Sequence, residues 1–411
     1  MSTKPIINID RLMSRIFEMA EIGATDKGGV NRLALTDLDK KARLLFSKWC
    51  KDLGMEVRFD EMGNQFARKV GSDPDLPPVL VGSHLDTQPT GGKYDGAVGV
   101  LGGLEVVETI IDRKIQHRHS VEIVNWTNEE GTRFSPAIMG SGVFAGAFET
   151  DFAYQCVDSN NHTLGKELER IGFKGTKQSR TDFKAFLEIH IEQGPILEDA
   201  GIPVGLVSGV NGIRWYKGVI TGEETHAGPS PMNMRHDPIM ILHSILAEIY
   251  QIGEKIGPDA RITIGSIITK PGSINTVPGQ VEFTIDIRHP KKDALHEMDR
   301  QLNQIFQKPR NPAEVKAELI ETWHSEPVQF HKKCIRAIRD AADKLEIPIL
   351  EMVSGAGHDA IYLSRITPTG MIFIPCKDGV SHNESEYAKA EDIEAGVSVL
   401  YEAILSLIEV L

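Results

Sequence analysis

VLVGSHLDTQPTGGKYDGAVG, residues 79–99, is the stretch that decides the fold. It begins with an apolar run typical of a buried strand, continues through a polar cluster with His84 and Asp86, and enters a glycine-rich loop with Asp95. In an open α/β sheet, side chains at the carboxyl ends of parallel strands face a common crevice. An imidazole and two carboxylates gathered there can hold a metal ion, and the alternative is that they merely end a strand.

Further predicted strands end in side chains of the same chemistry. A lone histidine or acidic pair is more often a solvated or satisfied residue than a ligand. If the strands share one sheet, however, their ends face the same crevice, and the repetition favours a metal site. The residues concerned are Glu129 and Glu130 after the strand 121–126, His190 in the strand 186–191, and His382 after the strand 371–374.

Composition and charge limit the classes of function. The chain has 411 residues, 41% of them hydrophobic and 25% charged, which fits a globular protein of roughly two to three domains. Its formal net charge of −13 disfavours nucleic acid and anionic membranes as partners, although local cations can still bind an anionic small substrate. We expect no membrane span and no signal peptide. The cysteines are far apart and lack CxxC spacing, which fits a cytoplasmic protein.

The middle of the chain predicts a second domain. Its apolar patterns follow the order βαββαβ, that of the ferredoxin-like arrangement, and the run 281–287 alternates as in a sheet with one buried face. We expect an inserted α+β domain over 209–327, within an α/β domain formed by 1–208 and 328–411 whose mixed, largely parallel sheet is flanked by helices. The elements expected in the insert are strands 213–222, 261–269, 281–288 and 315–323 and helices 238–256 and 291–307.

Several sequence motifs are spread over nearly the whole chain. In order they are SHLDTQPTGGKYDG, NWTNEEGTRF, EIHIEQGP, HAGPSPMNMRHD, SINTVPGQVEFTIDIR, SGAGHDA and DGVSHNESE. Together they resemble the amidase and carbamoylase branch of the M20 metallopeptidase superfamily, which contains N-carbamoyl-L-amino acid hydrolases, β-ureidopropionase and allantoate amidohydrolase. The resemblance implies a hydrolase that cleaves the ureido C–N bond of N-carbamoyl-L-amino acids or N-carbamoyl-β-alanine to amino acid, CO2 and NH3.

The resemblance also implies two divalent metal ions that share a bridging carboxylate. It assigns Asp95 as the bridge, His84 and His190 to one ion, and Glu130 and His382 to the other. Peptidase relatives usually have a carboxylate where this chain has His190, and this difference favours the amidase branch. Histidine and carboxylate ligands of this kind accept Zn²⁺, Mn²⁺, Co²⁺ or Ni²⁺.

Other implied roles concern catalysis. Glu129 matches the family's general base, which takes a proton from water and delivers it to the departing ammonia. Asp86 fits a supporting role, accepting the second imidazole N–H of His84 and fixing its tautomer. His226 matches a histidine that enters the neighbouring subunit's site and stabilises the tetrahedral intermediate, which implies a homodimer formed through the inserted domain. The alternative for His226 is a polar residue that ends a strand before a Gly-Pro turn.

The remaining implied roles concern a small carboxylate substrate with a ureido group. Gln193 contacts the carbamoyl group, and Arg288 can grip the carboxylate with two hydrogen bonds. Asn275 matches the family's second carboxylate contact. Gly357 offers a backbone N–H, because glycine allows close approach. A surface ion pair is the alternative for Arg288.

Other interpretations stay open. An allantoate amidohydrolase or an M20-type dipeptidase uses the same kind of site and differs in substrate. A protein that binds ureido compounds or amino acids without turnover would lack the base or a ligand, and the sequence retains both. His358 and Asp359 either support the metal site or cap the helix that follows them.

Overall fold

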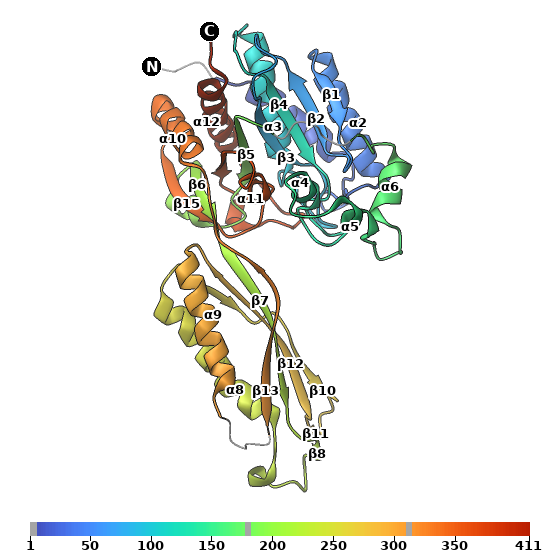
Figure 1. Ribbon diagram of the computed structural model, residues 1–411, viewed down its shortest axis with the longest axis vertical. Coiled ribbons are helices and arrows are strands. Elements are labelled where there is room, and N and C mark those ends of the chain that lie inside the picture. The colour runs from blue at the N-terminus through green and yellow to red at the C-terminus, as the bar shows by residue number, and fades with distance from the viewer. Residues whose placement is uncertain (1–5, 177–181, 310–314) are drawn as a thin grey trace. The chain divides into compact units, whose positions relative to one another are not determined.

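The computed structural model describes residues 6–176, 182–309 and 315–411 (Figure 1). These described residues form two compact units. One comprises the described part of Met1–Ser208 together with Phe330–Leu411, and the other, Gly209–Gln329, is inserted between those two segments. The roles expected for the units, catalysis for the first and dimerisation for the second, stay predictions.

The first unit is built around a mixed β-sheet. In sheet order its strands are β1 (Glu56–Phe59), β2 (Gln65–Lys69), β4 (Val121–Trp126), β3 (Val79–His84), β5 (Ala185–Ile191), β16 (Thr369–Ile374) and β6 (Val204–Val210), with β15 (Ile349–Ser354) paired to β6. The short strand β14 (Val328–Gln329) belongs to the inserted segment and pairs with the last two residues of β6, which also belong to that segment. The central strands β4, β3, β5 and β16 run parallel, whereas β1, β2, β6 and β14 pair antiparallel. The carboxyl ends of the central strands therefore meet at one edge.

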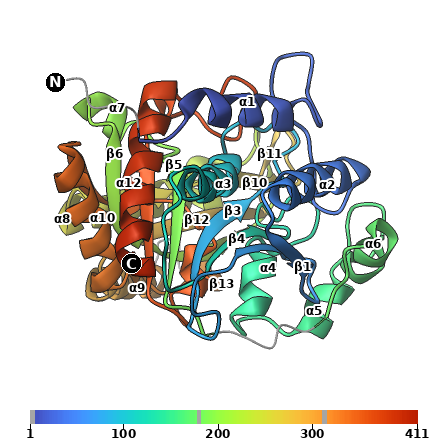
Figure 2. The ribbon, with the colours of Figure 1, turned by 90° about the horizontal axis from the view of Figure 1, so that it is seen from above.

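Helices cover both faces of this sheet, and the central strands are therefore buried along their whole length (Figure 2). One face is covered by α1 (Ile9–Ala20), α2 (Asp37–Asp52), α3 (Ala97–Asp112), α10 (Lys332–Leu345) and α12 (Ala390–Ile408). The other is covered by α4 (Met139–Phe144) and α11 (Ala360–Leu363), with α5 (Thr150–Gln155), α6 (Leu164–Ile171) and α7 (Ile196–Ala200) nearby in the same unit. The predicted α/β class, with a mixed and largely parallel sheet flanked by helices, is confirmed.

The inserted unit has an antiparallel sheet with two helices on one face (Figure 1). In sheet order the strands are β10 (Ile267–Lys270), β12 (Gln280–His289), β7 (Gly212–Thr221) and β13 (Lys316–Ser325), with β9 (Arg261–Thr263) paired to β12. The helices are α8 (Pro238–Ile256) and α9 (Lys292–Gln307). The short strands β8 (Thr225–His226) and β11 (Thr276–Val277) pair separately.

The chain order of these elements is βαββαβ, as expected, but one predicted strand is interrupted. The run 261–269 forms β9 and β10, which both pair with β12. The break contains Gly265, and glycine weakens a strand interior. Among the described residues, no helix is both long enough and apolar enough to span a lipid bilayer.

Candidate metal centre

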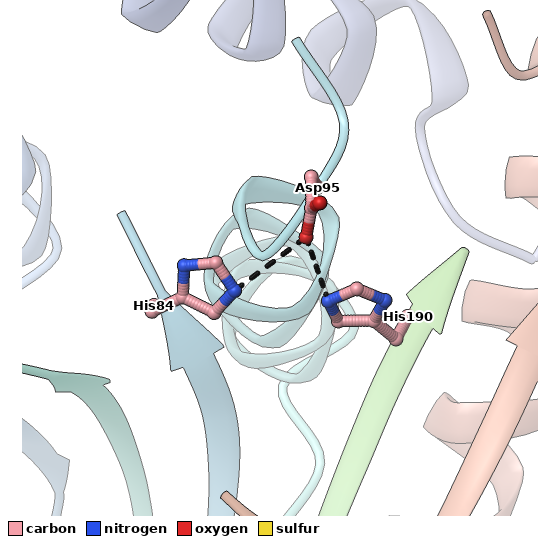
Figure 3. Close-up of side chains that lie close together, drawn as sticks. All are labelled: His84, Asp95 and His190. Carbon is pink, nitrogen blue, oxygen red and sulfur yellow. Dashed lines mark ion pairs between the residues drawn. The ribbon is translucent and has the colours of Figure 1, made fainter. Parts of the chain in front are cut away.

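The first group of predicted ligands meets at the carboxyl ends of β3 and β5. His84 is the last residue of β3, and His190 is the last but one of β5. Asp95 comes from the loop before α3 and points its carboxylate between the two rings (Figure 3). Its Oδ1 lies 3.5 Å from His84 Nε2 and 3.0 Å from His190 Nε2. All three side chains are buried, and their ligand atoms could hold one ion.

A second group shares the same aspartate. Asp95 Oδ2 lies 3.4 Å from His382 Nε2, which in turn lies 3.4 Å from Glu130 Oε2. Glu130 follows β4, and His382 follows β16. The two carboxylate oxygens of Asp95 thus face two different groups of ligand atoms. This is the arrangement that a bridging carboxylate between two cations requires.

Backbone contacts set the orientation of the two buried imidazoles. Nδ1 of His84 lies 2.9 Å from the carbonyl oxygen of Asp86, and Nδ1 of His190 lies 2.9 Å from that of Ile191. Because a carbonyl oxygen only accepts, each Nδ1 carries the proton. Loss of the proton from Nε2 leaves each ring with a lone pair directed toward Asp95, which is the form that binds a metal ion.

The contact predicted between Asp86 and the His84 ring is made by the backbone of Asp86. Its carboxylate Oδ1 is 4.0 Å from His84 Nδ1, whereas the carbonyl oxygen of the same residue makes the hydrogen bond. The carboxylate instead accepts the backbone N–H groups of Glu129 and Glu130, each at 3.3 Å. Asp86 thus supports the site in two ways. Its backbone carbonyl orients the predicted ligand His84, and its side chain holds the loop that carries the predicted base Glu129.

Buried negative charge is concentrated at this site. The ion pairs of Asp95, Glu129 and Glu130 among the described residues are all with histidines. Burial raises the pKa of Glu129 well above its usual value, with Asp359 and Glu130 adding to the effect, and burial raises the pKa of Glu130 to about 7. Divalent cations would offset this unfavourable burial of charge, so the donor set fits a metal pair.

Asp95 behaves differently from the two glutamates. Burial alone would raise the pKa of its carboxyl group, but hydrogen bonds from His190, His382 and His84 outweigh burial and hold the pKa well below its usual value. The bridging position is therefore ionised at neutral pH, as a metal-binding carboxylate must be.

Sequence reasoning missed side chains that hold the predicted ligands. Gln88 donates its backbone N–H to Glu130 Oε1 at 3.1 Å and its amide to Oε2 at 2.6 Å. Glu386 accepts the backbone N–H of Asp95 at 3.1 Å, and Ser381 Oγ lies 3.0 Å from both acidic side chains. A signal was available, because Gln88 lies in the QPTGG segment and the other two flank His382 in DGVSHNESE.

Gln193, expected to contact the substrate, lies at the same bridge. Its amide donates to Asp95 Oδ2 at 3.0 Å and lies 3.5 Å from His382 Nε2.

Gly357 lies in the loop before α11, where an added Cβ would come within 3.0 Å of Ile138 Cδ1. The role expected for its backbone N–H, contact with the substrate, stays a prediction.

The roles of His358 and Asp359 become more definite. The buried His358 ring packs on His190 with centroids 4.5 Å apart, and burial holds its pKa well below the usual value. The side chain of Asp359 makes no hydrogen bond that would cap α11. Its carboxylate instead accepts a hydrogen bond from the hydroxyl group of Ser141. The helix-capping alternative is therefore wrong for the Asp359 side chain, and His358 supports a predicted ligand.

The other predicted substrate contacts belong to the inserted unit. His226 is exposed on β8, and its Nδ1 accepts the N–H of Gly228 at 3.1 Å. Asn275 lies beside it, since its carbonyl oxygen accepts the N–H of Ala227 at 2.9 Å. Arg288, on β12, forms an ion pair with Asp286 at 2.8 Å.

Gly96 allows a close approach that the site needs, and we predict that Gly96→Ala weakens metal binding. The residue has φ +63°, and a Cβ there would lie 2.5 Å from the His84 ring. Gly146 is a matched control, because it has φ +72° with no atom within 4 Å of an added Cβ. Both alanine variants should lose about 1 kcal/mol or more of unfolding free energy. Only Gly96→Ala should lose metal affinity, by about 10- to 100-fold in a chelator competition titration.

Equal metal affinity in the two alanine variants would contradict this account of Gly96. It would mean that the His84 ring can move aside without consequence for the predicted ligand group.

The chain matches one protein family, and it is similar to several known proteins over nearly its whole length. The model of peptidase family M20/M25/M40 matches residues 80–406. The chain is 42% identical over 405 residues to the N-carbamoyl-L-amino-acid amidohydrolase of Rhizobium meliloti, which covers 98% of this chain and 97% of that protein. It is 35% identical over 392 residues to the allantoate amidohydrolase of Bacillus subtilis, covering 95% of each. An amidase of the hydantoinase/carbamoylase family from Burkholderia multivorans has a solved structure that matches with a TM-score of 0.93 and 44% identity over 99% of both chains.

Proposed function

The chain belongs to peptidase family M20/M25/M40, and we propose that it hydrolyses the ureido C–N bond of N-carbamoyl-L-amino acids to amino acid, CO2 and NH3. The observation that carries the proposal is the position of Asp95, whose two oxygens face separate ligand groups beside the buried Glu129. The 42% identical relative from Rhizobium meliloti, named as an amidohydrolase of this substrate class, supports the choice of reaction.

We propose that the site holds two divalent metal ions. His84 and His190 would hold one, Glu130 and His382 the other, and Asp95 would bridge them. When bound, such a pair polarises a carbonyl oxygen and makes a water molecule more acidic, which a ureido carbonyl needs because two nitrogens donate into it. Zn²⁺, Mn²⁺, Co²⁺ and Ni²⁺ all suit histidine and carboxylate ligands.

Glu129 is proposed as the general base. Its Oε2 lies 3.4 Å from His84 Nε2, so the carboxylate stands directly beside the first ligand group. The side chain is buried, and burial raises its pKa well above the usual value. A carboxylate of raised pKa takes a proton readily, so Glu129 can accept the proton of the attacking water and pass it to the departing ammonia.

The other proposed contacts orient the substrate. The amide of Gln193 would turn to the carbamoyl group, and the backbone N–H of Gly357 would bind close to it. Arg288 and Asn275 would hold the carboxylate, and His226 would stabilise negative charge on the carbonyl oxygen during attack. These contacts need a substrate that carries a carboxylate and a ureido group on one small molecule.

The spacing of residues in the inserted unit supports a homodimer with shared sites. Arg288 pairs in register with Ile213, whereas Gln280, at the other end of β12, pairs with Thr221. The strand runs about 27 Å between Gln280 and Arg288, and Asn275 lies beyond the Gln280 end. One chain therefore cannot bring Arg288 and Asn275 to the same carboxylate. We propose that Arg288 serves its own subunit's site and that His226 and Asn275 serve the partner's.

Mixing of inactive variants tests this sharing. Glu129→Gln and His226→Ala are each expected to be nearly inactive alone. In a mixed dimer one site regains both residues, so dissociation and random reassociation of equal amounts should restore about a quarter of wild-type activity. The matched control is a mixture of Glu129→Gln with Arg288→Ala, which should restore nothing because both residues serve the same subunit. Failure of the first mixture to recover would argue against exchange of His226.

A cytoplasmic location is also proposed. Cys50, Cys156, Cys334 and Cys376 are free. Free thiols of this kind persist in a reducing compartment.

A substrate panel tests the proposed reaction. Metal-reconstituted protein is offered N-carbamoyl-L-methionine, N-carbamoyl-β-alanine, allantoate and a dipeptide, each with and without a chelator. We expect chelator-sensitive release of ammonia from N-carbamoyl-L-methionine at the highest kcat/KM. Ammonia from allantoate alone, or cleavage of the dipeptide alone, would contradict the proposal. Allantoate is included because the Bacillus subtilis relative is an allantoate amidohydrolase.

A further inference from the structure

Within the inserted unit, one face of the sheet carries an unusual group of side chains. Tyr216 and Ile287 are buried against the helices α8 and α9. Because side chains alternate along a strand, Trp215, Asp286 and Arg288 lie on the opposite face, which no helix in the described part of this unit covers. The predicted carboxylate-binding arginine therefore shares this face with an exposed aromatic residue.

Asp286 connects the arginine to the tryptophan. Arg288 donates from Nε to Asp286 Oδ1 at 3.0 Å and from Nη2 to Oδ2 at 2.8 Å. The indole N–H of Trp215, the direct cross-strand partner of Asp286, donates to the same Oδ2 at 3.0 Å. A guanidinium held along two of its N–H directions has a fixed orientation. Asp286 is therefore placed to set the direction of the Arg288 guanidinium.

Trp215 is itself braced by a second tryptophan. Trp323 is its cross-strand partner on β13, and the ring centroids are 4.9 Å apart. The two residues remain 43% and 41% exposed. Large aromatic side chains usually bury more of their surface, and an exposed aromatic pair beside a charged group is typical of a binding surface.

A hollow opens beside Trp215. Its volume is about 300 Å³, at the lower end of the range for small-molecule pockets, roughly 300–1,000 Å³. The residues that line it from this face are Trp215, Thr263, Gly265, Thr284, Asp286 and Thr322. Asp286 is thus both a wall of the hollow and the partner of Arg288.

We propose that this hollow binds the side chain of the N-carbamoyl-L-amino acid and favours flat, apolar side chains, with Asp286 as the positioning residue for Arg288. The proposal rests on the proposed function. In an α-amino acid the carboxylate and the side chain are bonded to the same carbon. A carboxylate held by Arg288 therefore carries its side chain to the hollow that begins at Asp286.

This arrangement also distinguishes α- from β-amino acid products. N-carbamoyl-β-alanine has no side chain to place beside Trp215, whereas a phenylalanine side chain can stack on the indole and fill the hollow. Apolar pockets of this size discriminate between side chains by about 10- to 200-fold in kcat/KM. We expect N-carbamoyl-L-phenylalanine to exceed both N-carbamoylglycine and N-carbamoyl-β-alanine by a factor in this range.

Filling the hollow provides the test. Thr284 is an exposed residue of its wall, and Thr284→Phe would occupy the space with a ring. The ratio of kcat/KM for N-carbamoyl-L-phenylalanine to that for N-carbamoylglycine should fall at least about tenfold. Val219→Phe is the matched control, because Val219 lies on the same face of the sheet, paired in register with Glu282 and outside the hollow. The control should leave the ratio within about twofold of the wild-type ratio.

A second variant tests the positioning role of Asp286. Trp215→Phe keeps an aromatic ring but removes the indole N–H that holds Asp286. We expect KM to rise for every N-carbamoyl substrate, including N-carbamoylglycine, with a smaller change in kcat. A purely structural role would instead lower kcat for all substrates in parallel with the fraction of folded protein, which circular dichroism measures.

The possible results distinguish failure of the side-chain subsite from failure of the proposed function. If the wild type hydrolyses N-carbamoyl-L-phenylalanine and N-carbamoylglycine but Thr284→Phe leaves their ratio unchanged, the side-chain subsite is wrong and the proposed function stands. If the wild type hydrolyses neither, the proposed function fails, and the subsite fails with it. A lowered ratio in Thr284→Phe together with an unchanged ratio in Val219→Phe supports the subsite.

Discussion

Glu129→Gln is expected to lower kcat by about 10²- to 10⁴-fold while the metal content stays at the wild-type level. Glutamine has nearly the same shape as glutamate but cannot take a proton from water at neutral pH. Glu129 lies 3.4 Å from His84 Nε2, and it belongs to neither group of predicted ligands. The substitution should therefore remove proton transfer and leave the metal-binding side chains in place.

Ammonia release and elemental analysis on the same sample measure both effects. Glu130→Gln is the neighbouring control, because Glu130 is a predicted ligand and its substitution should also remove about one metal equivalent per subunit. A Glu129→Gln protein that retains more than about a tenth of wild-type kcat would contradict the role of general base. Loss of metal equal to that in Glu130→Gln would show instead that Glu129 is a ligand.

Asp95→Ala is expected to abolish activity and to weaken the binding of both metal ions by at least about 10²-fold. Each oxygen of the carboxylate faces a different ligand group, at 3.0 Å from His190 and at 3.4 Å from His382. Removal of this one side chain therefore affects both predicted positions at once. No other side chain among the described residues belongs to both ligand groups.

His382→Ala is the matched variant, because His382 belongs to the second group alone. Isothermal titration of metal-free protein should show two binding events per subunit in the wild type, one in His382→Ala and none of comparable affinity in Asp95→Ala. Two undiminished binding events in Asp95→Ala would contradict a bridging role.

The sequence predicted well those elements whose pattern is local and strong. The strand 121–126 and the helix 238–256 have the predicted bounds, as β4 and α8. The strand is rich in β-branched and aromatic residues and is followed by a polar segment, and the helix begins with an aspartate cap and proline in its first turn. Each element therefore has its own local signal. The meeting of His84 and His190 followed from the rule that parallel strands end at one edge of a sheet.

Other features depend on tertiary contacts that no local pattern shows. The Asp86 carboxylate is oriented by the backbone N–H groups of Glu129 and Glu130, in a loop that follows another strand. The supporting contacts of Gln88 and Glu386 likewise join segments distant in sequence. The separation of Asn275 from Arg288 became visible only when the register of β12 against β7 was known, although 13 positions separate them in the sequence.

The most direct test of the central claim is the stoichiometry of the reaction with N-carbamoyl-L-methionine. Metal-reconstituted protein should release one ammonia for each L-methionine formed, and a chelator should stop both products together. Restoring divalent metal should restore both. Release of L-methionine without ammonia, or turnover that persists in the metal-free protein, would contradict the account of this chain as a metal-dependent amidohydrolase of N-carbamoyl-L-amino acids.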